Sequence, residues 1–413
     1  MLFVLRNTWA LLLGLGLLML GNGMQGTLLG IRGDIEQFTT FQMSVVMSAY
    51  FAGFLFGSRL APGMIRRVGH VRVFAALGSM ISAVLILYAA APDWMVWVAL
   101  RVLIGFCFSG VYITAESWLN NASTNETRGQ ALSLYLIVQM VGIIAAQLLL
   151  NVGDPSGYIL FVIPSVLVSL AFTPILLSVS QAPAFETTKP LSFRRLYAAS
   201  PLGCVGMFLL GGVFSAQFGM ASVWGTKVGL SVADLTIFVS AIYVGGLVLQ
   251  YPIGWLSDRI DRRKVILALA AFGALALCLP VVMDLPFWGL VLIGAIGGGI
   301  SNPLYSLILA YVNDYLDKTD MAAASAGLLF INGVGAISGP IITGWMMGVI
   351  GPNGFFLFMG LLFGALAGYA AWRMARRPAT PQATSGFTPI SPTASVVAVE
   401  AAAMVDAEDA RMK

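Results

Sequence analysis

Long apolar stretches separated by short polar connections run along most of the chain. Each stretch approaches or exceeds the roughly 20 apolar residues that a helix needs to cross a bilayer. The runs lack the alternating polarity of a membrane β-barrel, and lipid requires backbone groups to be hydrogen-bonded internally, so we predict helices. The twelve predicted spans are residues 9–29, 43–60, 73–91, 94–118, 131–151, 157–179, 202–224, 235–256, 265–283, 287–312, 322–346 and 355–374.

Composition supports a membrane location. Apolar residues make up 59% of the chain, charged residues only 10%, and the mean hydropathy is +0.89. Soluble domains carry about 25% charged residues, so the outer face of this protein must contact lipid. The first apolar run resembles a signal peptide, but it continues to Leu29 without a typical cleavage site, and we expect it to be an uncleaved helix.

The basic residues predict the orientation. With an N-terminus in the cytoplasm, the connections on that side receive nearly all Lys and Arg, and the other side receives only Arg32 and Lys227. Positive charge marks cytoplasmic loops. We therefore expect a multi-pass protein of a bacterial cell inner membrane, with both termini cytoplasmic.

The chain divides into two halves at its longest connection. Residues 1–180 are predicted to form an N-terminal six-helix bundle, 181–201 a cytoplasmic central loop with a short surface helix, and 202–377 a C-terminal six-helix bundle. The loop at 67–73 is echoed at 259–265, as in transporters built from repeats. Residues 378–413, rich in Pro, Ala, Thr and Ser, are predicted to be a disordered cytoplasmic tail.

A polar stripe follows one face of the fourth span. At 100° per residue, its members fall within an arc of about 80°. They are Arg101, Gly105, Ser109, Tyr112 and Glu116. A charge within the membrane is costly and usually functional, so we predict that the stripe faces the bundle interior. Arg101 and Glu116 lie about 22 Å apart along the axis, too far to pair; we place Arg101 at the depth of Asn22 and Gln25, and Glu116 near the cytoplasmic mouth.

Sparse amides and aromatic residues on other spans suggest a solute cavity. Each alone is more typical of a hydrogen bond between helices, but together they can surround one centre. The predicted cavity residues are Asn22, Gln25, Tyr112, Gln139, Gln217, Trp224, Tyr243, Asn302, Tyr305 and Asn332.

One loop carries a distinctive motif, with a glycine, an acid and a cluster of arginines at the membrane edge: Gly254, Asp258, Arg259, Arg262 and Arg263. It resembles the signature loop of the major facilitator superfamily. Arg101 and Gly105 match that superfamily's arginine-x-x-x-glycine element. The resemblance implies two six-helix bundles rocking around a central cavity, with the loop stabilising the outward-facing state. The first-half copy departs from the pattern, with Pro62 and Arg66 in place of the glycine and the aspartate, so we expect the charge relay in the second copy.

Within the superfamily, three stretches look like a YcaD-like branch of bacterial transporters: residues 116–120, 69–74, and 304–306 with 313–314. We therefore predict a secondary active transporter that moves a small organic solute by alternating access. Efflux of drug-like or amphipathic metabolites is an alternative, and a membrane sensor or scaffold without transport is an alternative of another class.

The residue inventory argues against enzymatic chemistry. His70 is the only histidine, the three cysteines show no metal spacing, and the sequence holds no nucleotide-binding loop, so we predict no metal, no cofactor and no ATP coupling. Nucleic acid is not suggested as a partner. Proton coupling is the expected energy source by resemblance, with Glu116 as the candidate carrier. We expect a monomer.

Overall fold

The computed structural model describes residues 2–121, 123–177, 192–316, 320–376, 387–395 and 397–402. Within these ranges every regular element is helical. The helices are α1 (Leu2–Ile35), α2 (Thr40–Val68), α3 (His70–Ala90), α4 (Trp94–Asn121), α5 (Asn125–Leu149), α6 (Ile159–Leu177), α7 (Phe193–Ala199), α8 (Pro201–Ser215), α9 (Ala221–Lys227), α10 (Val232–Ser257), α11 (Arg262–Val282), α12 (Phe287–Asn313), α13 (Met321–Ile350) and α14 (Gly354–Arg376).

These helices confirm the prediction of an all-α membrane protein. Over the described residues, eleven helical segments are long and apolar enough to cross a bilayer. The shorter apolar helix α6 occupies the place of the sixth predicted span. The predicted seventh span consists of α8 and α9 joined by a π-helical turn at Ala216–Met220. The short α7 precedes it, in the described part of the predicted central loop.

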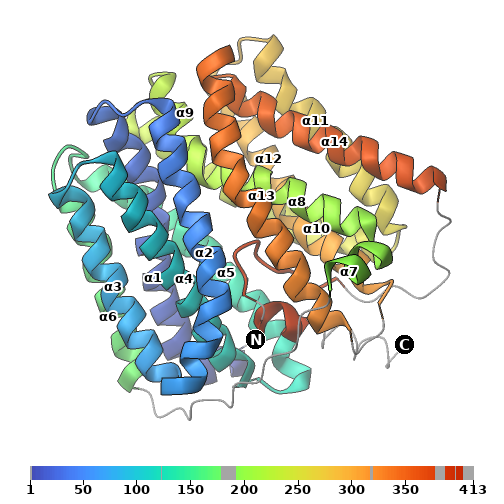
Figure 1. The fold of residues 1–413 in the computed structure, drawn as a ribbon, viewed down its shortest axis with the longest axis horizontal. Helices are drawn as coiled ribbons and strands as arrows, with labels where there is room; N and C mark the ends of the chain where they lie inside the picture. The colour runs from blue at the N-terminus through green and yellow to red at the C-terminus, as the bar shows by residue number, and fades with distance from the viewer. Residues whose placement is uncertain are drawn as a thin grey trace.

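The helices form two six-helix bundles with matching internal packing (Figure 1). In the first half, α1 packs on α5, α2 on α4, and α3 on α6. The second half repeats the scheme with α8 on α13, α10 on α12, and α11 on α14. This repetition is the pseudo-symmetry that the paired loops at 67–73 and 259–265 suggested.

Equivalent glycines let the paired helices approach at the backbone. A Cβ atom on Gly53 of α2 would lie 1.9 Å from the carbonyl oxygen of Val102 in α4. A Cβ atom on Gly245 of α10 would lie 1.9 Å from the carbonyl oxygen of Ala295 in α12. In lipid there is no hydrophobic driving force between helices, so their association depends on close van der Waals packing, which small residues allow. The two halves therefore rely on the same device.

The two ends of the bundle differ in how the halves meet. We call the end that carries Arg66, Arg262 and Arg263 the basic end, and the end that carries Asp34 and Lys227 the Asp34 end. At the Asp34 end the halves contact each other through an ion pair between Lys227 Nζ and Asp34 Oδ1 at 2.8 Å. The view in Figure 1 shows the halves converging near α9 and diverging toward the opposite side.

The C-terminal segment contradicts part of the prediction of a disordered tail. Residues 387–395 and 397–402 are placed between the two halves, where Figure 1 shows them in dark red. Ala394, Ser395 and Val399 are each at most 2% exposed. Their small size allows burial in a narrow space, which composition alone did not reveal. The rest of the range 378–413 lies outside the described residues.

Candidate functional site

A pocket between the two halves gathers many of the predicted cavity residues. With the C-terminal residues in place, its free cavity volume is about 10 Å³. Predicted residues from both halves line it: Asn22, Tyr112, Gln139, Tyr243 and Asn302. Asn332 lines a neighbouring pocket, and Phe214 and Thr393 line both. Amides, phenols and aromatic rings therefore surround a shared centre.

Two amide side chains in this pocket have unused hydrogen-bonding capacity. Gln139 is 2% exposed, and neither its Nε2 nor its Oε1 has a hydrogen-bond partner among the described residues. Asn302 donates from Nδ2 to the carbonyl of Gly298 at 3.2 Å, while its Oδ1 has no partner within the same described part of the chain. Because an unmet buried polar group costs about 1–3 kcal/mol, these atoms favour a polar ligand.

Arg101 is joined to the pocket by a relay of amides. Its Nη1 donates to Gln25 Oε1 at 3.2 Å, and Gln25 Nε2 donates to Asn22 Oδ1 at 2.8 Å. Asn22 Nδ2 then donates to the hydroxyl of Tyr112 at 2.8 Å. The guanidinium, fully buried, also lies 4.9 Å from the ring centre of Tyr50. The predicted depth of Arg101 beside Asn22 and Gln25 is the one observed.

Glu116 lies at the other end of the same polar stripe. The hydroxyl of Tyr135 donates to its Oε1 at 2.7 Å. Its Oε2 accepts from the backbone N–H of Ser395 at 2.9 Å and also from the Ser395 hydroxyl. The carboxylate is 2% exposed and contacts no Lys or Arg in these bonds. Its partners are neutral hydroxyl and backbone groups.

A π-helical turn shapes the side of the pocket nearer the Asp34 end. Such turns inside α-helices are frequently functional. The turn at Ala216–Met220 carries Phe218, whose ring lies 5.6 Å from Tyr50 and 6.0 Å from Phe51 in the opposite half. Phe214 stacks on Phe218 at 5.9 Å. These rings form an aromatic layer that connects the two halves.

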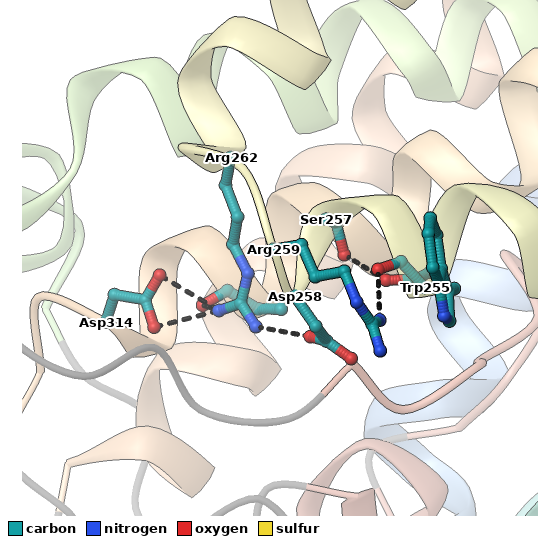
Figure 2. A network of polar contacts seen from close by, with 8 residues as sticks. Trp255, Ser257, Asp258, Arg259, Arg262 and Asp314 are labelled. Carbon is teal, nitrogen blue, oxygen red and sulfur yellow. Dashed lines mark hydrogen bonds and ion pairs between the residues drawn. The ribbon is translucent and has the colours of Figure 1, made fainter.

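The predicted signature loop forms a polar network at the basic end (Figure 2). Arg262, with 1% of its side chain exposed, donates from Nη1 to both carboxylate oxygens of Asp314, at 2.8 and 2.9 Å. Its contact with Asp258 is longer, at 3.4 Å. Arg259 lies over the ring of Trp255 at 4.0 Å. Thus Asp314, at the end of α12, is the closer acidic partner.

The adjoining Arg263 has a separate partner. It pairs with Asp261 at 2.7 Å, and Asp261 also caps α11 by accepting from the backbone N–H of Arg263. This guanidinium lowers the pKa of the Asp261 carboxyl below its ordinary value. Gly254 lies where a Cβ would approach within 2.4 Å of the Phe387 ring.

Three predicted cavity residues lie elsewhere. Trp224 stacks on Phe355 and packs against Phe238 in an aromatic cluster of the second half. Gln217 lines a separate pocket of that half and accepts from Ser301 Oγ at 2.8 Å. Tyr305 is buried on α12, one turn beyond Asn302. Helical periodicity predicts a shared face, but it does not reveal which neighbour covers that face.

Several residues of the site were absent from the predicted set. Asp314 follows a span at the same membrane edge as the signature loop, which is the signal that could have suggested it. Ser391 and Thr393 line the central pocket from the C-terminal segment. No pattern in the sequence distinguishes them from the rest of a Pro- and Ser-containing tail.

Comparison with known proteins defines the class. The family profile of the Major Facilitator Superfamily matches residues 11–223 and 202–404. The chain belongs to this superfamily of membrane transporters, and it is a transporter rather than an enzyme.

The relatives agree with that class. The chain is 28% identical over 364 residues to the uncharacterized MFS-type transporter YcaD of Escherichia coli O45:K1, covering 86% of this chain and 92% of that protein. A mutant of the nucleoside transporter NupG has a similar fold, with a TM-score of 0.76, 15% identity, and coverage of 89% and 99%. A bacterial homologue of the human lysosomal transporter Spinster, inward-facing and unoccupied, gives 0.67 at 14% identity, with coverage of 97% and 98%.

Proposed function

We propose that this protein is a secondary active transporter that moves a small, neutral, hydroxyl- or amide-bearing organic solute by alternating access. The observation that carries this proposal is the pair of buried amides, Gln139 and Asn302, whose unpartnered atoms line a pocket between the halves. Gln139 offers a donor and an acceptor, and Asn302 offers an acceptor. A solute that supplies the complementary groups removes the cost of leaving them unpaired.

The way the two halves contact each other supports the assignment of an inward-facing state. The halves contact each other at the Asp34 end, and rings of the aromatic layer connect the halves beside the pocket. Positive charge marks the cytoplasmic side of bacterial inner-membrane proteins, so we assign the basic end and both termini to the cytoplasm. Motion of the halves about the pocket would then expose it to the other face.

A ligand-stabilisation screen tests the solute class. A ligand at 100 times its Kd stabilises the folded state by about 2.7 kcal/mol. We expect a neutral polyol, sugar, nucleoside or amide to raise the melting temperature of the purified protein by several degrees. The shift should disappear in Gln139→Ala and Asn302→Ala. It should persist in Gln217→Ala, whose amide accepts from Ser301 in a separate pocket of the second half; a shift that survives in all three variants would place binding elsewhere.

Coupling to protons is the second part of the proposal. Glu116 is a buried carboxylate in the membrane-spanning α4, and it is bonded to Tyr135 and to the C-terminal segment, so a change in its charge would alter contacts at the basic end. A Glu116→Gln variant in proteoliposomes should lose acceleration of solute uptake by a pH gradient while keeping solute binding. Acceleration equal to that of the unmodified protein would reject this role.

Two further roles follow from the site. We assign Arg101 to the organisation of the pocket through Gln25 and Asn22. Arg101→Ala should abolish transport, whereas a sensor or scaffold would tolerate the loss.

We assign the loop from Gly254 to Arg263 to gating, and we propose that the monomer is the working unit. Efflux of amphipathic metabolites is the competing direction, supported by the aromatic rings that line the neighbouring pocket. Transport in oppositely oriented vesicles distinguishes efflux from uptake.

A further inference from the structure

The C-terminal segment, residues 387–395 and 397–402, occupies the space through which the central pocket would open at the basic end. Ser391 and Thr393 line the pocket that holds Gln139 and Asn302. Pro392 and Thr393 line the neighbouring pocket with Asn332. The segment therefore reaches the depth of the proposed solute site.

The segment is bonded to both halves. In the first half, Glu116 accepts hydrogen bonds from the backbone and the hydroxyl of Ser395. In the second half, Ser306 Oγ accepts from the backbone N–H of Ile390 at 2.9 Å and donates to its carbonyl at 3.0 Å. Phe387 packs so closely against Gly254 that a Cβ on this glycine would clash with its ring. These contacts fix the segment as a bridge between the halves.

The composition of the segment suits this position. Ala394, Ala398, Val399, Ala401 and Ala402 are each at most 3% exposed and belong to the continuous apolar core. Short side chains fill a narrow space between helices without forcing them apart. Burying them removes apolar area from water, at about 25 cal/mol per Å². Apolar burial therefore stabilises the docked segment in addition to its hydrogen bonds.

We infer that this segment is an internal plug, which blocks the solute pocket and holds the basic end open until it leaves. The blocking role rests on the proposed function, since it treats the pocket as the solute path. The halves cannot close at the basic end while residues between Ser306 and Glu116 separate them. The plug is tethered to α14 by the ten residues 377–386. Because the plug belongs to the same chain, a solute must displace a covalently attached occupant of the pocket.

A labelling experiment tests the plug without a known solute. The full-length chain receives Gln139→Cys in a background in which Cys107, Cys204 and Cys278 are replaced. The probe is N-ethylmaleimide, and the readout is its second-order rate of reaction with the new thiol. The releasing substitution is Ser395→Glu, which sets a second carboxylate against Glu116. A chain ending at Gly386 provides an independent release if that substitution impairs folding.

Release of the plug should accelerate labelling at least 10-fold in both altered chains. The matched control is Ala410→Glu, which adds the same charge outside the plug and should leave the rate unchanged. A thiol at Val152, 69% exposed near the Asp34 end, should react equally in every chain. Equal rates at position 139 in the intact, Ser395→Glu and truncated chains would overturn the inference. Because no solute is used, that result would leave the proposed function standing.

Discussion

The two ends of this transporter hold their halves together by different means. At the Asp34 end, side chains of the two halves bond directly: Lys227 pairs with Asp34, and Asn151 Nδ2 donates to Thr236 at 3.1 Å. At the basic end, Glu116 and Ser306 each bond to the C-terminal segment between them. Arg59 also lies over the ring of Phe330, at 4.2 Å, where α2 meets α13.

The ion pairs within and between the halves differ in burial. The ion pair between the halves, Lys227–Asp34, is more than a third exposed on both partners. Exposed pairs contribute only about 0–1 kcal/mol, so this contact can break cheaply. The buried pair Arg262–Asp314 joins α11 to α12 inside one half. The buried pair therefore lies within one half, and the exposed pair lies between the halves.

The largest expected effect separates the two acids that contact Arg262. Removing one partner of a buried ion pair costs about 3–5 kcal/mol, because the remaining charge stays buried. Asp314→Ala should therefore lower the free energy of unfolding by about that amount. Asp258→Ala is the matched control, since its carboxylate is 35% exposed and 3.4 Å away, and it should cost less than about 1 kcal/mol. Chemical denaturation measures both, and equal losses would contradict the assignment of Asp314 as the main partner.

The second largest effect is expected from a substitution at Gly30, at the Asp34 end. A Cβ atom on Gly30 would lie 2.1 Å from the hydroxyl of Ser222 in the other half. Such overpacking costs about 1–3 kcal/mol, so Gly30→Ala should weaken closure there. A thiol at Gln139 should then react roughly 10-fold faster or more with an impermeant maleimide from that side. Gly26→Ala, where the nearest atom is 3.7 Å away, should leave the rate unchanged; an increase of the same size would show that contact with Ser222 is not the cause.

The Asp261 cap predicts a pH-dependent effect at the basic end. Losing a helix cap costs about 1 kcal/mol, and Asp261→Ala should lower the free energy of unfolding by that amount at pH 7. The folded pKa of Asp261 is lowered by Arg263. Its stabilisation is therefore present above the unfolded pKa, about 3.9, and is lost as the pH falls through the lower folded pKa. Urea titrations at pH 7 and at progressively lower pH should show the variant and the parent converging; a constant difference would refute the charge contribution.

The smallest effect concerns the exposed pair at the Asp34 end. Lys227→Gln should weaken closure by less than about 1 kcal/mol. We expect a rise of at most about 5-fold in labelling of the same thiol at low ionic strength. The difference should fade at about 1 M salt, where the Debye length is about 3 Å. An effect that grows with salt would show that the pair does not favour closure.

Much of this architecture was predictable from the sequence, because lipid imposes simple rules. Apolar length marked the spans, and depth along the helices predicted that Arg101 lies level with Asn22 and Gln25, where it bonds to Gln25. Trp224 was predicted to line the cavity, but it packs against Phe238 and Phe355. A helical face can pack against aromatic neighbours or line a cavity, and its sequence does not show which. Asp314 lies 52 positions from Arg262, and no local pattern connects them.

The C-terminal segment shows the limit of composition most clearly. Small and polar residues such as Ala394 and Ser395 have little to bury in isolation, which is typical of disorder. Here the two bundles supply the buried surface, and Glu116 supplies the hydrogen-bond acceptor. The placement of this segment therefore depends on contacts with the two bundles, which its own sequence does not reveal.

Alternating access is tested most directly by asking from which faces the pocket can be reached. Asn302→Cys, in the Ser395→Glu chain without native cysteines, is reconstituted in vesicles of each orientation and treated with a membrane-impermeant maleimide. The account predicts labelling from both faces, faster from the basic end. Labelling from one face alone would contradict transport, whatever the plug does.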